Sequence, residues 1–165
     1  MWNNWSVETA LEWKIADQIE ELTSQGDAFA ANHRFVEAMA AYEAAWNLLP
    51  EPRVQWEEST PILGALGDFA YFLADYPAVR DYVSYALLCP NGEGNGFLHF
   101  RLGAAHYRFG DLQRAADQLR KAYDAEGFDL FDGEDPALWD FLKSYVPAPA
   151  TGWPDAPKAR WWKVA

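Results

Sequence analysis

Three glycines in this chain, Gly26, Gly67 and Gly103, are followed by small residues at the same two distances. The position 12 residues after each glycine holds Ala38, Val79 or Ala115, and the position 19 residues after it holds Ala45, Ala86 or Ala122. Two antiparallel helices approach closely only where small side chains face one another, so we expect each glycine to meet the alanines of the following helix. A spacing that occurs three times predicts three helical hairpins and constrains the fold more than any single motif.

The residues around these glycines resemble the tetratricopeptide repeat (TPR), a helical hairpin of about 34 residues with the pattern W-x2-L-G-x2-Y, then A-x3-F and P. The first copy contains Leu22, Gly26, Phe29, Ala38, Tyr42, Ala45 and Pro50, the third contains His99, Leu102, Gly103, His106, Ala115, Leu119 and Ala122, and the second is looser. The resemblance implies an all-α fold, a TPR-like right-handed superhelical stack of about three helical hairpins plus a C-terminal capping helix. An ordinary alanine-rich helical bundle is the alternative.

Capping and helix-breaking residues predict where the helices begin and end. Ser6 is expected to cap a first helix that runs to about Ala31, and a second helix from about Phe35 to Leu49 ends before Pro50. Thr60 and Pro61 are expected to open the third helix, Asp75-Tyr76-Pro77 to lead into the fourth, and Gly110-Asp111 to divide the third hairpin. The glycine-rich stretch 91–96 is interpreted as a flexible connector. Asp135-Pro136 predicts a last helix, Ala137 to Tyr145, that caps the stack.

These elements predict one TPR-like domain over residues 1–145, followed by a Pro/Trp-rich tail over residues 146–165 that is extended or loosely ordered. Residues 1–20 carry four carboxylates and no long apolar run, which argues against a secretory signal, and no stretch approaches transmembrane length. The single cysteine, Cys89, excludes an internal disulfide. We therefore expect a cytoplasmic protein that does not enter a membrane.

Acidic residues dominate the charge of the chain, which is −12 overall. Residues 1–100 contain 15 acidic and 4 basic side chains, whereas residues 101–165 contain 10 and 9. Nucleic-acid phosphates require basic patches, so this composition argues against nucleic-acid binding. An acidic surface attracts a basic protein partner by electrostatic steering, although it also serves simply to keep a protein soluble.

The TPR resemblance implies a concave groove lined by the first helix of each hairpin. Positions shortly after each glycine, and those one turn before it at Thr23, Gly64 and Phe100, are expected to face this groove. The residues expected to contact a protein partner there are Asp27, Asp68, Tyr71, Phe72, Phe100, Tyr107 and Arg108. The groove would thus be aromatic with an acidic half. Family members that hold the C-terminal carboxylate of heat-shock chaperones use lysine and asparagine at these places. Asp27 and Asp68 stand where asparagines would, so that activity is not expected here.

The sequence contains no catalytic arrangement of serine, cysteine or metal ligands, and we predict a binding protein rather than an enzyme, with no cofactor and no metal. The glycines Gly92, Gly94 and Gly96 follow no strand and lack the lysine of a phosphate-binding loop. His99 and His106 are interpreted as packing or groove residues, and Cys89 as a small buried residue.

An acidic cluster after the third repeat, Asp129, Asp132, Glu134 and Asp135, is either a solvated loop or a docking patch for a basic partner. The surrounding residues, about 95–145, resemble a group of small bacterial TPR proteins, most specifically through Glu134-Asp135-Pro136 and the following Phe141-Leu142-Lys143. Members of that group are encoded beside polymorphic toxins, including the Rhs type and those delivered by type VI secretion.

The resemblance implies an immunity protein that neutralises a co-encoded antibacterial toxin by direct binding, the toxin domain being basic. The alternative is a TPR adaptor or secretion-associated chaperone that holds a peptide or effector in its groove.

Overall fold

The computed structural model describes residues 11–154, and the ordered elements within that range are all helical. The first four α-helices are α1 (Trp13–Ala31), α2 (Phe35–Leu48), α3 (Ser59–Phe72) and α4 (Tyr76–Ala86), with the short 3-10 helix η1 (Arg53–Gln55) before α3. The remaining elements are α5 (Gly96–Phe109), α6 (Leu112–Glu126), the 3-10 helix η2 (Gly127–Leu130) and α7 (Pro136–Tyr145). None of these helices is long and apolar enough to span a bilayer.

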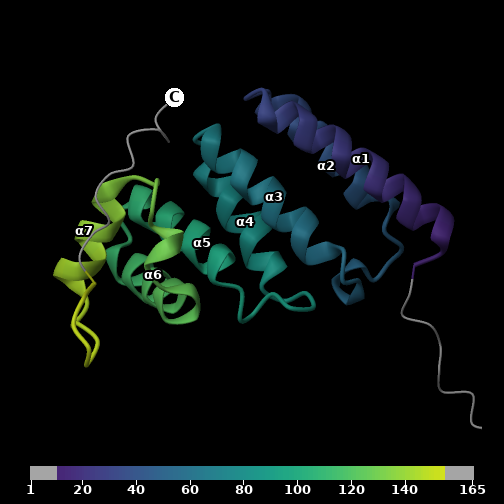
Figure 1. The fold of residues 1–165 in the computed structure, drawn as a ribbon. Helices are drawn as coiled ribbons and strands as arrows, with labels where there is room; N and C mark the ends of the chain where they lie inside the picture. Colours follow the sequence, from purple (N-terminus) through teal and green to yellow (C-terminus); the bar gives the residue numbers. More distant parts are fainter. Residues whose placement is uncertain (1–10, 155–165) are drawn as a thin grey trace, which may run out of the picture. The chain divides into compact units, whose positions relative to one another are not determined.

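The helices labelled in Figure 1 divide between two compact units. Unit 1 ends at Glu93 and contains α1 to α4; α1 packs against α2, α3 against α4, and α2 against α3. Unit 2 begins at Gly94; α5 packs against α6, which also contacts η2 and α7. The three helical hairpins and the additional last helix confirm the predicted all-α TPR-like architecture.

The three repeated glycines lie at the closest approach of the helices in each hairpin. A Cβ added to Gly26 would lie 2.5 Å from Cδ2 of Tyr42, one added to Gly67 would lie 2.5 Å from Cγ2 of Val83, and one added to Gly103 would lie 2.8 Å from Cγ of Leu119. A Cβ at Gly26 would also lie 3.4 Å from the Ala38 carbonyl oxygen, so glycine does meet alanine there, but the nearest atoms at all three glycines belong to a larger residue. Each glycine leaves room for the larger side chain that stands 16 residues later. The alanines of the spacing are buried beside this contact.

Side-chain caps begin four of the helices. Asp75, Asn95, Asp111 and Asp135 each accept a hydrogen bond from a backbone N–H in the first turn of α4, α5, α6 and α7. Such caps typically contribute about 1 kcal/mol each. The punctuation predicted at Asp75-Tyr76-Pro77, Gly110-Asp111 and Asp135-Pro136 is confirmed, with α7 beginning at Pro136.

Two predicted helix starts are wrong. The backbone of Glu12 is extended, with ψ of 133°, so α1 begins at Trp13; the predicted cap Ser6 lies outside the described residues. Thr60 does not cap α3, because the helix begins at Ser59 and the buried Thr60 hydroxyl donates to the carbonyl oxygen of Pro90 at 2.5 Å.

The glycine-rich stretch 91–96 leads from α4 into α5, and part of it is packed. Gly92 is buried, its N–H donates to the Cys89 carbonyl oxygen at 3.0 Å, and a Cβ there would collide with the Ala86 carbonyl oxygen. Asn95 then caps α5. In the tail, residues 146–154 contain no helix, as predicted, and the rest of the tail lies outside the described range.

Candidate functional site

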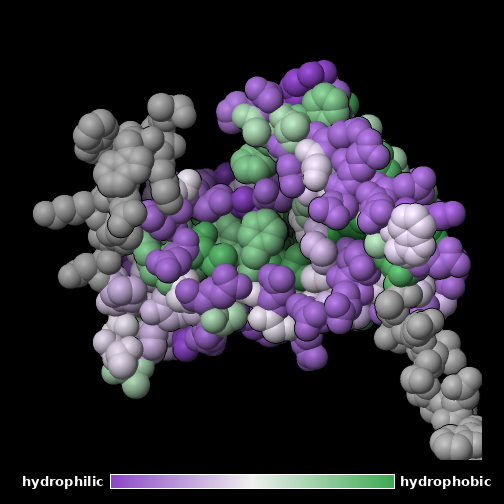
Figure 2. Space-filling model, turned by 45° about the vertical axis from the view of Figure 1, so that its right-hand side comes forward, coloured by the Kyte–Doolittle hydropathy of each residue, from purple (hydrophilic) through white to green (hydrophobic). Residues whose placement is uncertain are grey.

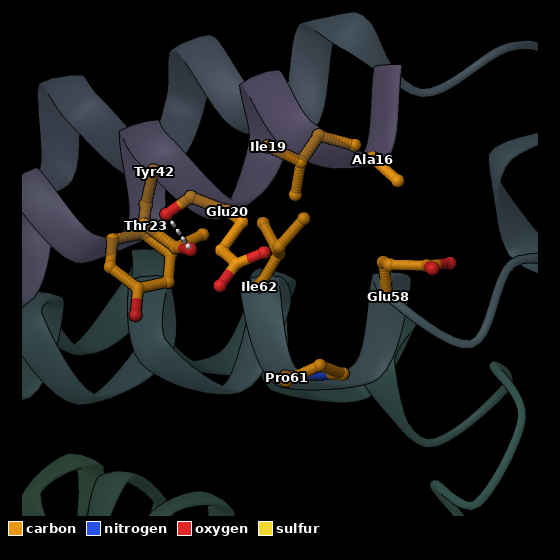
Figure 3. Close-up of a pocket in the computed structure, with 8 residues that line it drawn as sticks. All are labelled: Ala16, Ile19, Glu20, Thr23, Tyr42, Glu58, Pro61 and Ile62. Atoms are coloured by element: carbon orange, nitrogen blue, oxygen red, sulfur yellow. Dashed lines mark hydrogen bonds between the residues drawn. The ribbon is translucent and has the colours of Figure 1, made fainter. Parts of the chain in front are cut away.

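A pocket of about 370 Å³ opens between α1 and α3 in unit 1 (Figure 3). Its lining consists of Ala16, Ile19, Glu20 and Thr23 from α1, Tyr42 from α2, and Glu58, Pro61 and Ile62 at the start of α3. Ile19 and Ile62 are almost fully buried and form an apolar floor. Figure 3 shows the Tyr42 ring at one end of the pocket, Glu58 at the other and the Glu20 carboxylate between them.

Tyr42 connects the pocket to the hairpin packing. Its ring fills the space left by Gly26, and its hydroxyl donates to a carboxylate oxygen of Asp27 at 2.6 Å. Burial and this hydrogen bond raise the pKa of the Tyr42 phenol well above its usual value. The phenol is therefore neutral at physiological pH and stays a donor, which holds Asp27 against the second helix of its own hairpin.

The electrostatic character of the pocket is acidic. Glu20 and Glu58 contribute carboxylates, and none of the described lining side chains is basic. The three arginines of unit 1 are engaged by nearby carboxylates: Arg34 with Glu37 at 2.9 Å, Arg53 with Glu51 at 3.0 Å and Arg80 with Asp81 at 2.9 Å. Lys14 lies over the ring of Trp13, 5.5 Å from its centroid.

The predicted groove residues of unit 1 are only partly brought together. Tyr71 and Phe72 lie side by side at the end of α3, with ring centroids 6.4 Å apart, and Phe72 stacks on Phe35 of α2 at 4.7 Å. Phe72 remains 51% exposed. Asp68 lies one turn earlier on α3 and is half-buried, whereas Asp27 bonds to Tyr42.

The predicted groove residues of unit 2 make packing contacts and an ion pair within that unit. Phe100 is 1% exposed and meets Phe131 edge-on at 5.0 Å, so it belongs to the core rather than to an open surface, contrary to prediction. Tyr107 packs on Phe141 of α7 at 5.1 Å. Arg108 forms an ion pair with Asp135 at 2.7 Å, which joins α5 to the start of α7.

The predicted acidic docking patch is largely committed to the fold. Glu134 accepts two hydrogen bonds of 3.0 Å from the guanidinium of Arg101, which is 3% exposed. Asp135 caps α7 and pairs with Arg108. Asp129 is exposed and Asp132 half-buried. The four carboxylates therefore do not form one free surface, because two of them hold the third hairpin to the last helix.

Sequence reasoning missed most residues of the pocket. The predicted groove face of the first helix ended at Thr23, one turn before Gly26. Glu20 and Ala16 continue the same face, at spacings of three and four residues. On α3, Glu58 and Ile62 are four residues apart on one face, but Ile62 is six residues from Asp68 and so lies on a different face. Tyr42 carries no such signal, because its place in the pocket depends on the position of α3.

Other candidate side chains have packing roles. Nδ1 of His99 lies 2.7 Å from Oε1 of Gln118, and His106 is buried beside Phe109. Cys89 is a buried free thiol whose pKa is raised by burial. Within residues 11–154, no group of three or more potential ligands is placed to hold a metal ion.

The sequence matches no protein-family model and no curated protein. Among solved structures, the chain is similar to the C-terminal TPR-containing domain of a Plasmodium falciparum protein named for FK506 binding, at 17% identity and a TM-score of 0.64, covering 82% of this chain and 90% of that one. It is also similar to the Sgt2 TPR domain from Aspergillus fumigatus, at 18% identity and a TM-score of 0.60, covering 92% and 96%. The protein therefore has the all-α fold of tetratricopeptide-repeat domains.

Proposed function

We propose that this protein is a binding module that holds another protein on the first helices of its hairpins. The observation that carries this proposal is the pocket between α1 and α3. The first helices of two successive hairpins line this pocket, and its floor is apolar. Pockets of about 300 Å³ or more are the usual size for specific binding. Figure 2 shows that hydrophobic residues are also exposed among hydrophilic ones on one face of the molecule.

We propose further that the partner is a basic toxin domain encoded by a neighbouring gene, and that binding neutralises it. The support is the net charge of −12 together with the resemblance of residues 95–145 to immunity proteins. The Glu134-Asp135-Pro136 motif has a structural role here, so the charge of residues 1–100 is the stronger argument. An acidic surface accelerates encounter with a basic partner.

The adaptor alternative is favoured by the size of the pocket, which accommodates side chains of an extended segment rather than a folded surface. The two proposals differ in what binds. An adaptor would bind an isolated peptide of its partner nearly as well as the whole protein, whereas an immunity protein requires the folded toxin domain. Titration with both forms of one partner separates them.

Co-expression tests the toxin proposal. Cells that express the toxin domain of the neighbouring gene should survive only when this protein is also present, and the toxin domain and this protein should co-purify. Association should slow as salt rises from about 0.05 to 0.5 M, because the Debye length shrinks several-fold. Loss of survival despite normal expression of this protein would contradict the proposal, and a salt-independent association rate would exclude acidic steering.

The aromatic side chains at the end of α3 provide a second test. Phe72→Ala is expected to weaken partner binding by about 2 kcal/mol, because truncation of an aromatic anchor removes a large contact area. Tyr71→Ala should act in the same direction. Leu88→Ala is a matched control, since Leu88 is an apolar side chain of unit 1 that is 72% exposed and lies after α4. Equal affinity of all three variants, measured calorimetrically with unchanged helicity, would place the partner elsewhere. Phe100→Ala is unsuitable because Phe100 is a core residue.

A further inference from the structure

We infer that the pocket between α1 and α3 binds one long cationic side chain of the partner, lysine or arginine. The aliphatic part of that side chain would lie on Ile19 and Ile62, and its charged end would meet Glu20 and Glu58. This inference rests on the proposed protein-binding function and specifies the chemistry of its anchor.

The shape and polarity of the pocket argue for a side chain with two different parts. The floor is apolar, since Ile19 is 5% and Ile62 is 2% exposed and Ala16 and Pro61 add further apolar surface. An occupant of this floor must present hydrocarbon to exclude water. Glu20 and Glu58 also line the pocket, the Glu20 carboxylate near its middle and Glu58 at one end, so the same occupant also approaches carboxylates (Figure 3). Lysine and arginine combine an apolar stem with a charged end, and they bury the stem while the charge stays near water.

Charge complementarity excludes the opposite occupant. The Glu20 carboxylate is directed between the two helices, and the Thr23 hydroxyl donates to the backbone oxygen of Glu20 at 3.1 Å (Figure 3). The arginines of unit 1 pair with carboxylates outside the pocket, so they do not neutralise Glu20 or Glu58. A carboxylate ligand would meet two like charges at close range, which costs binding energy. The pocket thus selects a cation.

Isoleucine methyl signals make the pocket directly observable. The chain contains three isoleucines, Ile15, Ile19 and Ile62, of which the last two line the pocket and Ile15 does not. A full-length sample labelled at isoleucine methyl groups therefore gives two reporter signals and one internal control. The probe is a short blocked peptide with one lysine between two leucines. Its titration should shift the signals of Ile19 and Ile62 and leave that of Ile15 nearly unchanged.

Two substitutions in the probe and the protein test the cation itself. Replacing the lysine by Nε-acetyllysine keeps the stem and removes the charge, and should weaken binding about five-fold or more. Glu20→Gln and Glu58→Gln should each weaken binding of the lysine peptide by about three- to five-fold. Glu21→Gln and Glu57→Gln are the matched controls. They change the net charge equally at adjacent exposed positions that are not part of the pocket lining, and should alter affinity by less than about two-fold.

The outcomes separate this inference from the proposed function. Equal effects of the pocket variants and their controls, or equal binding of lysine and acetyllysine peptides, would overturn the cation assignment. So would a titration that shifts Ile15 as much as Ile19 and Ile62, or that shifts none of them. If the neighbouring toxin domain binds but is insensitive to Glu20→Gln with Glu58→Gln, the pocket inference fails and the toxin proposal stands. If the peptide binds as described and the toxin domain does not, the pocket inference stands and the toxin proposal fails.

Discussion

Glu134→Ala is expected to lower the free energy of unfolding by about 3 kcal/mol, although Glu134 lies in a loop. Its carboxylate accepts hydrogen bonds of 3.0 Å from both terminal nitrogens of Arg101, and the Arg101 side chain is only 3% exposed. Removing the carboxylate takes a bidentate anion away from a buried guanidinium, which is more costly than losing a surface ion pair. The rings of Phe97 and Phe100 lie 5.3 and 5.5 Å from the guanidinium carbon and offset part of that loss.

Chemical denaturation of three variants measures this effect. Asp129→Ala removes an exposed carboxylate from the same acidic cluster and should change stability by less than about 0.5 kcal/mol. The double variant Arg101→Met with Glu134→Leu removes both charges and should recover most of the loss, because an apolar pair avoids the desolvation of the ions. If Glu134→Ala and Asp129→Ala are equally stable, Glu134 acts as a surface residue and the structural role assigned to it is wrong.

Gly103→Leu is expected to destabilise the protein by about 1 to 3 kcal/mol through overpacking of the third hairpin. Its Cβ would lie 2.8 Å from Cγ of Leu119 and 3.0 Å from the Leu119 backbone nitrogen. The backbone nitrogen belongs to α6 and cannot rotate away as the end of a side chain does. The helices α5 and α6 must therefore separate. For a chain of this length each kcal/mol lowers the melting temperature by about 2–4 °C.

The matched control is Gly94→Leu, because a Cβ at Gly94 meets no atom within 4 Å. Gly94→Leu should melt close to the parent protein in a thermal scan followed by circular dichroism. Adding Leu119→Ala to Gly103→Leu opens the space that the new side chain needs and should reduce the combined loss below the sum of the single losses. An unchanged melting temperature for Gly103→Leu would contradict the close approach of α5 and α6.

Most of the helical architecture could be predicted because its signals are local. Proline at Pro50, the caps Asp75, Asp111 and Asp135, and the repeated glycines act within one or two turns of the helix that they end, begin or pair. The error at Thr60 arose because a residue that usually caps a helix had another partner. The Thr60 hydroxyl reaches the Pro90 carbonyl 30 positions later in the chain. A contact between residues so far apart in the chain cannot be predicted from a local sequence pattern.

The candidate site could be predicted less well, since it depends on which residues of different helices meet. Helical spacing from Thr23 back to Glu20 and Ala16 indicates one face of α1, but not that Ile62 of α3 lies opposite. Phe100 and Glu134 resemble surface residues by their position in the repeat and in a charged run. Their partners Phe131 and Arg101 stand more than 30 positions away and decide that both are structural.

The sequence by itself determined that this chain forms helical hairpins, because the Gly26, Gly67 and Gly103 spacing permits close helix packing and repeats three times. It also determined an acidic molecule with few basic side chains in its first hundred residues. The tertiary structure alone decided that each glycine accommodates the large side chain 16 residues later, as at Gly103 and Leu119. It alone decided that the acidic pocket lies between α1 and α3. The physical reason is that burial and pairing are properties of two surfaces in contact, whereas a sequence pattern describes one element at a time.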